Sequence, residues 1–534
     1  MGNHNSHDKP STDGSGSGAS TPRGSTRGAR SGSSGELQGH TDKPEAPAPL
    51  SLVPVEKLGK NAMGLPAISE LRFTIVGIQV RNLKRKKPCI KPTCKLLAQR
   101  SQKEDGVNGV TENSFTKYLF PRYPELARQF YWYIHRLGKC KNKHIPLNTF
   151  RHQCERILAI LDDNIIIDTY VRMFCTDPEE AKVTPEDLRS LLYVSYKLSM
   201  DYYPEGPQTC MQINKTLNAV VNGCYNKKES HSVGFVVRWL EEHCHRLIFP
   251  VHRYCVHLLA TRHRELESQL ESSPGESGTG IELATPVLDR VGPRAALLPV
   301  SAAWLVAATL SQLYTRPLKP PPVTTSGGGS ASAAWMSRLV CALPSHWVPL
   351  YSSNEHGLGA NRFLHHTLAY RGPTLVVVSG KAECGETVTV VVASPQEWRE
   401  THQYCGGPDC ALVQLYPTFS LVERGPRMLY LNTCIRGYPK GLRAGADPRS
   451  PQLSVNEGFD GFTFKGAPYP LNAIEVWGCG DGALRESQLD VKKWQVKEAE
   501  RHRNVKISAA DWIEHPDRYL LEMAGRPQYN TTAS

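Results

Sequence analysis

The 534-residue sequence lacks the marks of several common protein classes. Its 15 cysteines follow no regular spacing and its first residues are polar, so we predict neither a disulfide scaffold nor a secretory leader, but free thiols in a reducing compartment. The fingerprints G-x-x-x-x-G-K-[ST], G-x-S-x-G and H-E-x-x-H do not occur. The net charge of +12 permits contact with anionic partners. No basic stretch carries interleaved aromatic residues, which disfavours nucleic-acid binding.

A long hydrophobic run is also missing. Residues 295–315 carry no charge and include AALLPVSAAWLVAATL, but Pro299, Ser301, Ser311 and Gln312 interrupt them. A transmembrane helix needs about 20 consecutive apolar residues, and the strongly apolar part here is only as long as a buried core helix. We expect a core or interface helix at this position, with a membrane span as the alternative.

The chain begins MGNHNS, which fits the M-G-x-x-x-[ST] pattern of N-myristoylation. In that reaction Met1 is removed and the amine of Gly2 is acylated, with Ser6 at the required polar position. Residues 1–48 are rich in Gly, Ser, Thr and Pro and have almost no large apolar side chains, so we predict a disordered tail. Such a tail would serve as a flexible leash for a lipid anchor.

One myristoyl chain binds a membrane only marginally, so a second membrane signal is expected. The stretch RNLKRKK, residues 81–87, is the candidate for a basic patch that faces an anionic membrane. A solvated loop or a nuclear-import-like stretch is the alternative. The basic residues of the patch are Arg81, Lys84, Arg85, Lys86 and Lys87.

Gly-, Ser- and Pro-rich stretches divide the rest of the chain. Apolar residues at helical spacing, such as Leu126, Phe130 and Ile134, predict an all-helical first block. Runs of β-branched residues predict strands in the last block, and therefore an α+β domain with two packed antiparallel sheets. The predicted organisation is a tail (1–48), a helical domain (105–270), a linker with a helical segment (271–332), an α+β domain (333–482) and a C-terminal extension with a helix (483–534).

Two loops of the helical block have the rhythm of paired EF-hands. With Ile145 and Val183 at the central β-positions, twelve-residue loops begin at Gly138 and Thr176. A calcium loop needs oxygen ligands at positions 1, 3, 5 and 12 and glycine at position 6. The first loop carries three lysines, and the second has proline at position 3 and alanine at position 6. We expect an EF-hand-like scaffold with degenerate loops that bind no calcium.

The last block carries several motifs in a fixed order. Together they resemble the TLDc family, in which an L-Y-S-x-x-x-H-G segment precedes a helix and a G-P-T-L strand, and an E-V-W strand closes the domain. The resemblance implies two packed antiparallel sheets flanked by helices over residues 333–482. The matching segments are LYSSNEHG (350–357), RGPTLVVV (371–378), YCGGPDCALV (404–413), YLN (430–432), PKGL (439–442) and IEVWG (474–478).

The neighbouring segments are similar to those of the myristoylated, mTOR-associated TLDc group. Residues 511–526, DWIEHPDRYLLEMAGR, look like the short C-terminal helix of that group. The resemblance implies a cytoplasmic protein on lysosomal or other endomembranes that associates with an mTOR-containing complex or with vacuolar proton-pump subunits. The apolar residues proposed to bind a partner, or to pack back onto the TLDc domain, are Trp512, Ile513, Tyr519, Leu520 and Met523.

The sequence also departs from the family pattern. Residues 441–446 read GLRAGA where the group has a G-L-G-M-G-G stretch, and Asp409 replaces a glutamate after the preceding glycine turn. The fold prediction tolerates both changes. A function tied to the glycine loop is not expected to transfer to this chain.

A search for catalytic or metal-binding residues gives weak candidates. His252 and Cys255 could ligate zinc, but no C-x₂-C knuckle accompanies them and Pro250 interrupts any single helix, so a half-buried helix surface is the favoured interpretation. Glu355, His356 and Asp409 could form an acid/base set, with helix caps and turn contacts as the alternative. We therefore expect a non-enzymatic adaptor without cofactor or metal; the alternative is a TLDc-type oxidative-stress protection protein with an uncharacterised enzymatic activity.

Overall fold

The computed structural model describes residues 90–176, 181–203, 208–209, 211–271, 287–288, 297–316, 339–341, 343–344, 346–382, 385–503, 517, 520 and 523–525. The predicted tail, its Gly2 and the basic patch at 81–87 lie outside these residues. Contacts divide the chain into Met1–Ile78 and Gln79–Ser534, and all described elements belong to the second unit. None of the described helices is long and apolar enough to cross a membrane.

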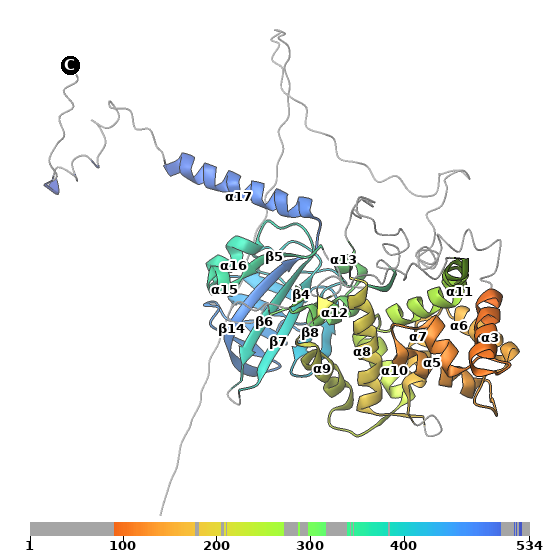
Figure 1. The fold of residues 1–534 in the computed structure, drawn as a ribbon. Coiled ribbons are helices and arrows are strands. Elements are labelled where there is room, and N and C mark those ends of the chain that lie inside the picture. The colour runs from red at the N-terminus through yellow and green to blue at the C-terminus, as the bar shows by residue number, and fades with distance from the viewer. Residues whose placement is uncertain are drawn as a thin grey trace, which may run out of the picture. The chain divides into compact units, whose positions relative to one another are not determined.

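The first part of this unit is helical (Figure 1). In α5, for example, Leu126, Phe130 and Ile134 are fully buried at helical spacing and form one apolar stripe. Two-residue strands β2 (Gln208–Thr209) and β4 (Val287–Leu288) pair in parallel. The helices are α3 (Lys91–Asp105), α4 (Glu112–Ser114), the π-helix η2 (Phe115–Leu119), α5 (Pro124–Leu137), α6 (Leu147–Leu158), α7 (Asp163–Phe174), α8 (Pro185–Asp201), α9 (Ile213–Tyr225), α10 (Val233–Cys244) and α11 (Phe249–Glu271).

The EF-hand-like loops pair differently from the prediction. Ile145 forms a β-bridge with Val110, in the loop after α3. Val183, in β1 (Lys182–Val183), pairs with His231 of β3 (His231–Ser232). The two loops chosen from the sequence therefore belong to two separate helix–loop–helix pairs. Neither partner loop has calcium ligands at the regular spacing, so neither was recognisable from the sequence.

The second part of the unit is an antiparallel sheet that folds into two layers joined by one long strand. The first half of β14 pairs with β13, and its second half lies between β6 and β5, so the predicted two sheets are one hydrogen-bonded structure. The strand order is β10-β11-β12-β13-β14-β6-β7-β8-β9. The strands are β5 (Val348–Ser352), β6 (Thr374–Lys381), β7 (Thr387–Ser394), β8 (Ala411–Tyr416), β9 (Ser420–Arg424), β10 (Leu429–Asn432), β11 (Gly441–Ala444), β12 (Leu453–Val455), β13 (Gly461–Phe464) and β14 (Ala467–Gly478).

The layer that contains β6 and β7 is buried on both faces. Val376 and Val378 share a core with the β10–β13 layer, whereas Leu375 and Val377 share a core with the helices. This alternation follows from the period of two along a strand. It explains why the runs TLVVV and TVTVVV consist of valine, leucine and threonine without a charged residue: both faces of this layer are buried.

Residues 297–315 of the uncharged segment lie at the junction of helices and sheet. They form α12 (Val300–Thr309) and the short α13 (Gln312–Thr315), and Trp304 is 1% exposed against Tyr196 of α8. The prediction of a core or interface helix is confirmed. A cluster of three hydroxyl groups links helices and sheet here. The Thr216 hydroxyl of α9 is hydrogen-bonded to Ser301 of α12 over 2.8 Å and to Tyr416 of β8 over 2.9 Å.

Candidate functional site

Where β14 ends, the chain turns sharply around the ring of Tyr370. Gly478 and Gly480 approach this ring so closely that a Cβ on either residue would overlap the phenol group. The Tyr370 hydroxyl accepts a hydrogen bond of 2.8 Å from the backbone N–H of Gly480. The glycines after the E-V-W motif therefore turn the chain from β14 into α17 (Gly482–Arg503).

The helix α17 is attached to the sheet domain by one buried polar side chain. Gln488, which is 0% exposed, donates hydrogen bonds of 3.0 and 2.9 Å to the carbonyl oxygens of His366 and Leu368. These carbonyls lie at the C-terminal end of α16 (Ala360–Thr367), where the last turn of a helix leaves carbonyls without intrahelical partners. Lys492 of α17 also donates to the carbonyl of His365.

Beyond Gln488 the helix carries large apolar side chains that are exposed to solvent. Leu489, Trp494 and Val496 are 40%, 61% and 53% exposed. Gln488 is the only buried residue of α17, so tertiary contacts within the described part of the chain account for its first half alone. Leu489 and Val496 lie seven residues apart on one side of the helix, and Trp494 lies on the other side. We call these three exposed residues together the α17 apolar surface. An exposed tryptophan of this kind is typical of a surface that another macromolecule covers.

A group of histidines lies where α16 meets α17. The rings of His356 and His366 are 3.9 Å apart between centroids, and His356 stacks on Tyr351 of β5. Burial, followed by the charges of His356 and Lys492, lowers the pKa of His366 to about 4. Burial next to Arg485 lowers the pKa of Lys492 to about 8. His366 is therefore neutral near pH 7, which avoids a further positive charge at this contact.

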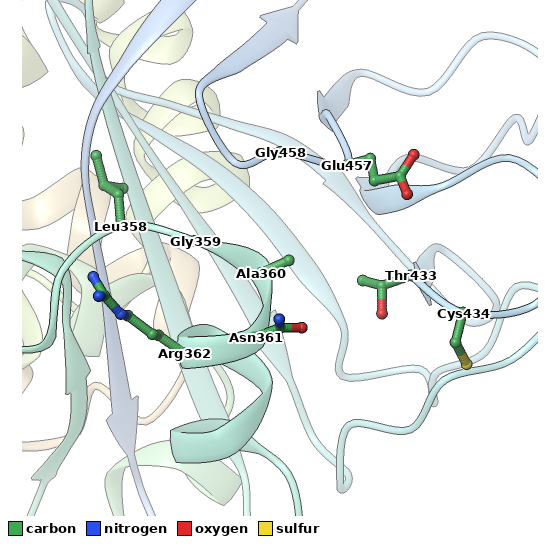
Figure 2. Close-up of a pocket in the computed structure, with 9 residues that line it drawn as sticks. All are labelled: Leu358, Gly359, Ala360, Asn361, Arg362, Thr433, Cys434, Glu457 and Gly458. Carbon is green, nitrogen blue, oxygen red and sulfur yellow. The ribbon is translucent and has the colours of Figure 1, made fainter. Parts of the chain in front are cut away.

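An open cleft of about 530 Å³ lies at the other end of α16. Figure 2 shows Ala360 and Asn361, in the first turn of α16, facing Thr433 and the turn at Glu457–Gly458 across the cleft, while Arg362 points away. Glu400 holds the wall of the cleft formed by Thr433 and Cys434. Its carboxylate accepts hydrogen bonds from the backbone N–H of Thr433 and the thiol of Cys434. The cleft is thus an open surface lined mostly by polar side chains and glycine backbone.

The E-V-W motif has a role that its sequence pattern does not reveal. Glu475, which is 5% exposed, accepts a hydrogen bond of 2.9 Å from the backbone N–H of Leu297 and another of 3.2 Å from the indole of Trp477. Burial raises the pKa of Glu475 despite these hydrogen bonds. Glu475 and Trp477 therefore fasten the segment that leads into α12 to the sheet. Leu297 precedes Glu475 by 178 residues, so no local signal could predict the contact.

Two sets of side chains selected from the sequence do not form a site. Among the described residues no hydrogen bond or ion pair joins Asp409 to Glu355 or His356; instead Nδ1 of His356 bonds to the backbone of Ser352. His252 is buried against Tyr170, with ring centroids 5.8 Å apart. No group of three possible ligands that could hold a metal ion is present in the described ranges.

The residues selected in the C-terminal tail are only partly described. Trp512, Ile513 and Tyr519 lie outside the described residues. Leu520 and Met523 are 58% and 78% exposed, so neither packs back onto the sheet domain in this structure. The α17 apolar surface was missed, because its apolar residues do not form a regular stripe among the many charges of α17.

Comparison with known families identifies the sheet domain. A family model described as "TLDc domain" matches residues 331–480. This chain contains a TLDc domain. The turn around Tyr370, the E-V-W strand and the cleft beside α16 all belong to it, whereas α17 follows directly after its last matched residue.

Curated relatives of the chain are fungal proteins named "Restriction of telomere capping protein 5". The protein of Leptosphaeria maculans is 24% identical over 251 residues, which cover 33% of this chain and 40% of that protein. Its namesake in Fusarium vanettenii is 27% identical over 242 residues, with 33% and 39% covered. The chain thus spans about two-fifths of the length of these relatives. Their names state nothing about a lysosome, mTOR or a proton pump.

The structure also shows how the altered glycine stretch of the TLDc domain, residues 441–446, is folded. Residues 441–444 are not a loop but strand β11, paired with β10 and β12. Gly441 has φ +103°, and a Cβ there would overlap the carbonyl oxygen of Val455, while Gly445 has φ +153° beside Gln452. These two positions need glycine, and both keep it. Arg443, Ala444 and Ala446 occupy positions without this constraint.

Proposed function

We propose that this chain is a non-enzymatic regulator that attaches to a membrane and binds a protein complex through its C-terminal region. The TLDc domain and the fungal relatives support a regulatory role in general terms. The membrane part of the proposal is supported by the N-myristoylation pattern at Gly2. An mTOR-containing complex or the vacuolar proton pump on an endomembrane is the proposed target, and only the resemblance stated above supports this choice.

The α17 apolar surface is the observation that carries the proposal. One buried glutamine fixes the base of the helix, and the helix then presents Leu489, Trp494 and Val496 without tertiary cover from the described part of the chain. Burying a tryptophan and two aliphatic side chains is worth several kcal/mol, roughly 1.5–3 kcal/mol for each fully buried side chain. Leu489 and Val496 share one side of the helix and Trp494 lies on the other, so a partner gains all of that energy only if it encloses the helix on both sides.

The test is affinity purification of the full chain from cells with a double variant, Trp494→Ser with Val496→Ser. We expect the co-purifying complex to be lost while the protein keeps its folded state, because both side chains are exposed. Tyr438→Ser, which removes a 48% exposed aromatic residue elsewhere on the TLDc domain, serves as the matched control. Equal recovery of the same partners by wild type and the double variant would refute the role of α17.

A further inference from the structure

The loop between α5 and α6 carries positive charge at a place where a calcium loop concentrates carboxylates. Lys139, Lys141 and Lys143 are all exposed in it. From Pro124 to Leu158, the two helices and their loop contain seven arginines and lysines against two glutamates. A cation site is excluded by this charge, and the same charge attracts an anionic surface.

The backbone of the loop is held in place without using the lysine side chains. The hydroxyl of Tyr131 donates a hydrogen bond of 2.8 Å to the carbonyl oxygen of Lys143, and Nε2 of His135 lies 2.6 Å from the carbonyl oxygen of Asn142. The β-bridge between Ile145 and Val110 closes its other end. Within the described residues the three ammonium groups form no ion pair, so they are available to a ligand.

The surroundings of the loop add apolar residues and leave few free carboxylates. Trp132 and Leu137, in the last two turns of α5, are 36% and 39% exposed. Glu112 already accepts a hydrogen bond from the Trp132 indole, and Asp168 pairs with Arg172 at 2.8 Å. Exposed lysines next to partly exposed tryptophan and leucine are suited to the boundary between lipid headgroups and acyl chains.

We infer that the loop Lys139–Lys143, with Trp132 and Leu137, binds the surface of an anionic phospholipid bilayer and supplies the second membrane signal of this chain. The inference rests on the proposed membrane attachment, since one myristoyl chain alone binds only marginally. The lysines stand on an exposed turn and do not line the neighbouring pocket, whose walls include Arg136 and Arg172. This arrangement favours an extended flat surface over a peptide held in a groove.

The test is sedimentation of the full, unacylated chain with phosphatidylcholine vesicles, with and without phosphatidylserine. We expect binding only to the vesicles that contain phosphatidylserine, and weaker binding as salt is raised. Each lysine near an anionic surface contributes about 1 kcal/mol, a factor of about five, so changing all three lysines to glutamine should weaken binding on the order of a hundredfold. Changing all three to arginine should preserve it.

A matched control removes three exposed lysines elsewhere, Lys227, Lys228 and Lys381, also as glutamine variants. The inference is overturned if wild type ignores phosphatidylserine, if the control loses as much binding as the loop variant, or if the arginine variant also fails while its unfolding temperature is unchanged. In cells, Gly2→Ala tests the acyl anchor separately. Unchanged membrane fractionation of Gly2→Ala would count against the proposed anchor and leave the vesicle result standing.

Discussion

At the scale of single residues, several buried or part-buried hydrogen bonds join positions far apart in the chain. Arg246, after α10, donates to the carbonyls of Ala307 and Leu310 at the end of α12, and Arg424 of β9 donates to Thr309. Burial and the neighbouring arginines lower the pKa of Arg246 to about 10. Glu475 accepts from the chain that enters the same helix. The uncharged α12 thus receives a carboxyl group before its N-terminus and positive charges at its C-terminus, as its dipole favours.

The first prediction concerns the buried carboxyl of Glu475. Because its pKa in the folded protein is raised above 4.5, the folded state binds this proton more tightly than the unfolded state. The free energy of unfolding should therefore fall, relative to Glu475→Gln, as pH rises from 4.5 through the raised pKa. The fall should be about 1.4 kcal/mol for each pH unit that separates the folded-state pKa from the unfolded-state pKa. Urea unfolding across this pH range measures the difference. Parallel curves for the two proteins would contradict it.

Local contacts at this scale were predictable from the sequence. The segment TPED at 184–187 predicts the start of a helix, and Thr184 and Asp187 indeed form a capping box at the start of α8. The second oxygen of Asp187 accepts from Thr176, so the carboxylate that would stand at position 12 of a calcium loop is occupied. Interactions within three or four residues leave a sequence signature, whereas those of Glu475 and Arg246 do not.

At the scale of elements, the contact between α9 and the hairpin of β8 and β9 is unusually close. A Cβ on Gly223 of α9 would overlap the backbone carbonyl oxygen of Phe419, and the Phe419 N–H donates to the carbonyl of Ala219 over 2.9 Å. Phe419 also packs edge-on against Trp239 of α10. The hairpin therefore docks on helical backbone, and only a glycine at this position allows that approach.

The second prediction compares two helical glycines. Gly223→Ala should lower the free energy of unfolding by about 1–3 kcal/mol, because the new methyl group meets rigid backbone. Gly234→Ala in α10, where nothing lies within 4 Å of the added Cβ, should instead raise it by up to about 1 kcal/mol through helix propensity. Denaturant unfolding of the two variants beside wild type checks both signs. A neutral or stabilising Gly223→Ala would show that the hairpin is not docked as described.

At the scale of the whole unit, the helices and the TLDc domain share a hydrophobic core. Leu375, Val377, Val391 and Val413, from three strands, are 0% exposed within the same cluster as the helices and α12. Within the described part of the unit, the helices and the sheet therefore meet mainly through apolar side chains, with a few hydrogen bonds such as that between Thr216 and Tyr416. The helical block is the cover that one face of the central sheet layer requires.

The third prediction concerns the TLDc domain without this cover. A fragment that begins at residue 333 and ends at 503 should expose the face that carries Leu375 and Val377, and should therefore aggregate or bind a hydrophobic dye strongly. The full chain should not. Gel filtration and dye fluorescence of the two proteins at equal concentration make the comparison. A monomeric fragment with low dye binding would mean that the shared core contributes little.

The sequence by itself determined the strands at 374–378 and 387–392, the helix start at Thr184 and the TLDc resemblance, because these depend on short periodicities and ordered motifs. Only the tertiary structure decided which EF-hand-like loops pair, how Glu475 holds α12 and where α17 leaves the TLDc domain. Those features depend on contacts between residues tens to hundreds of positions apart, where loop closure and packing, rather than local propensity, determine the partner.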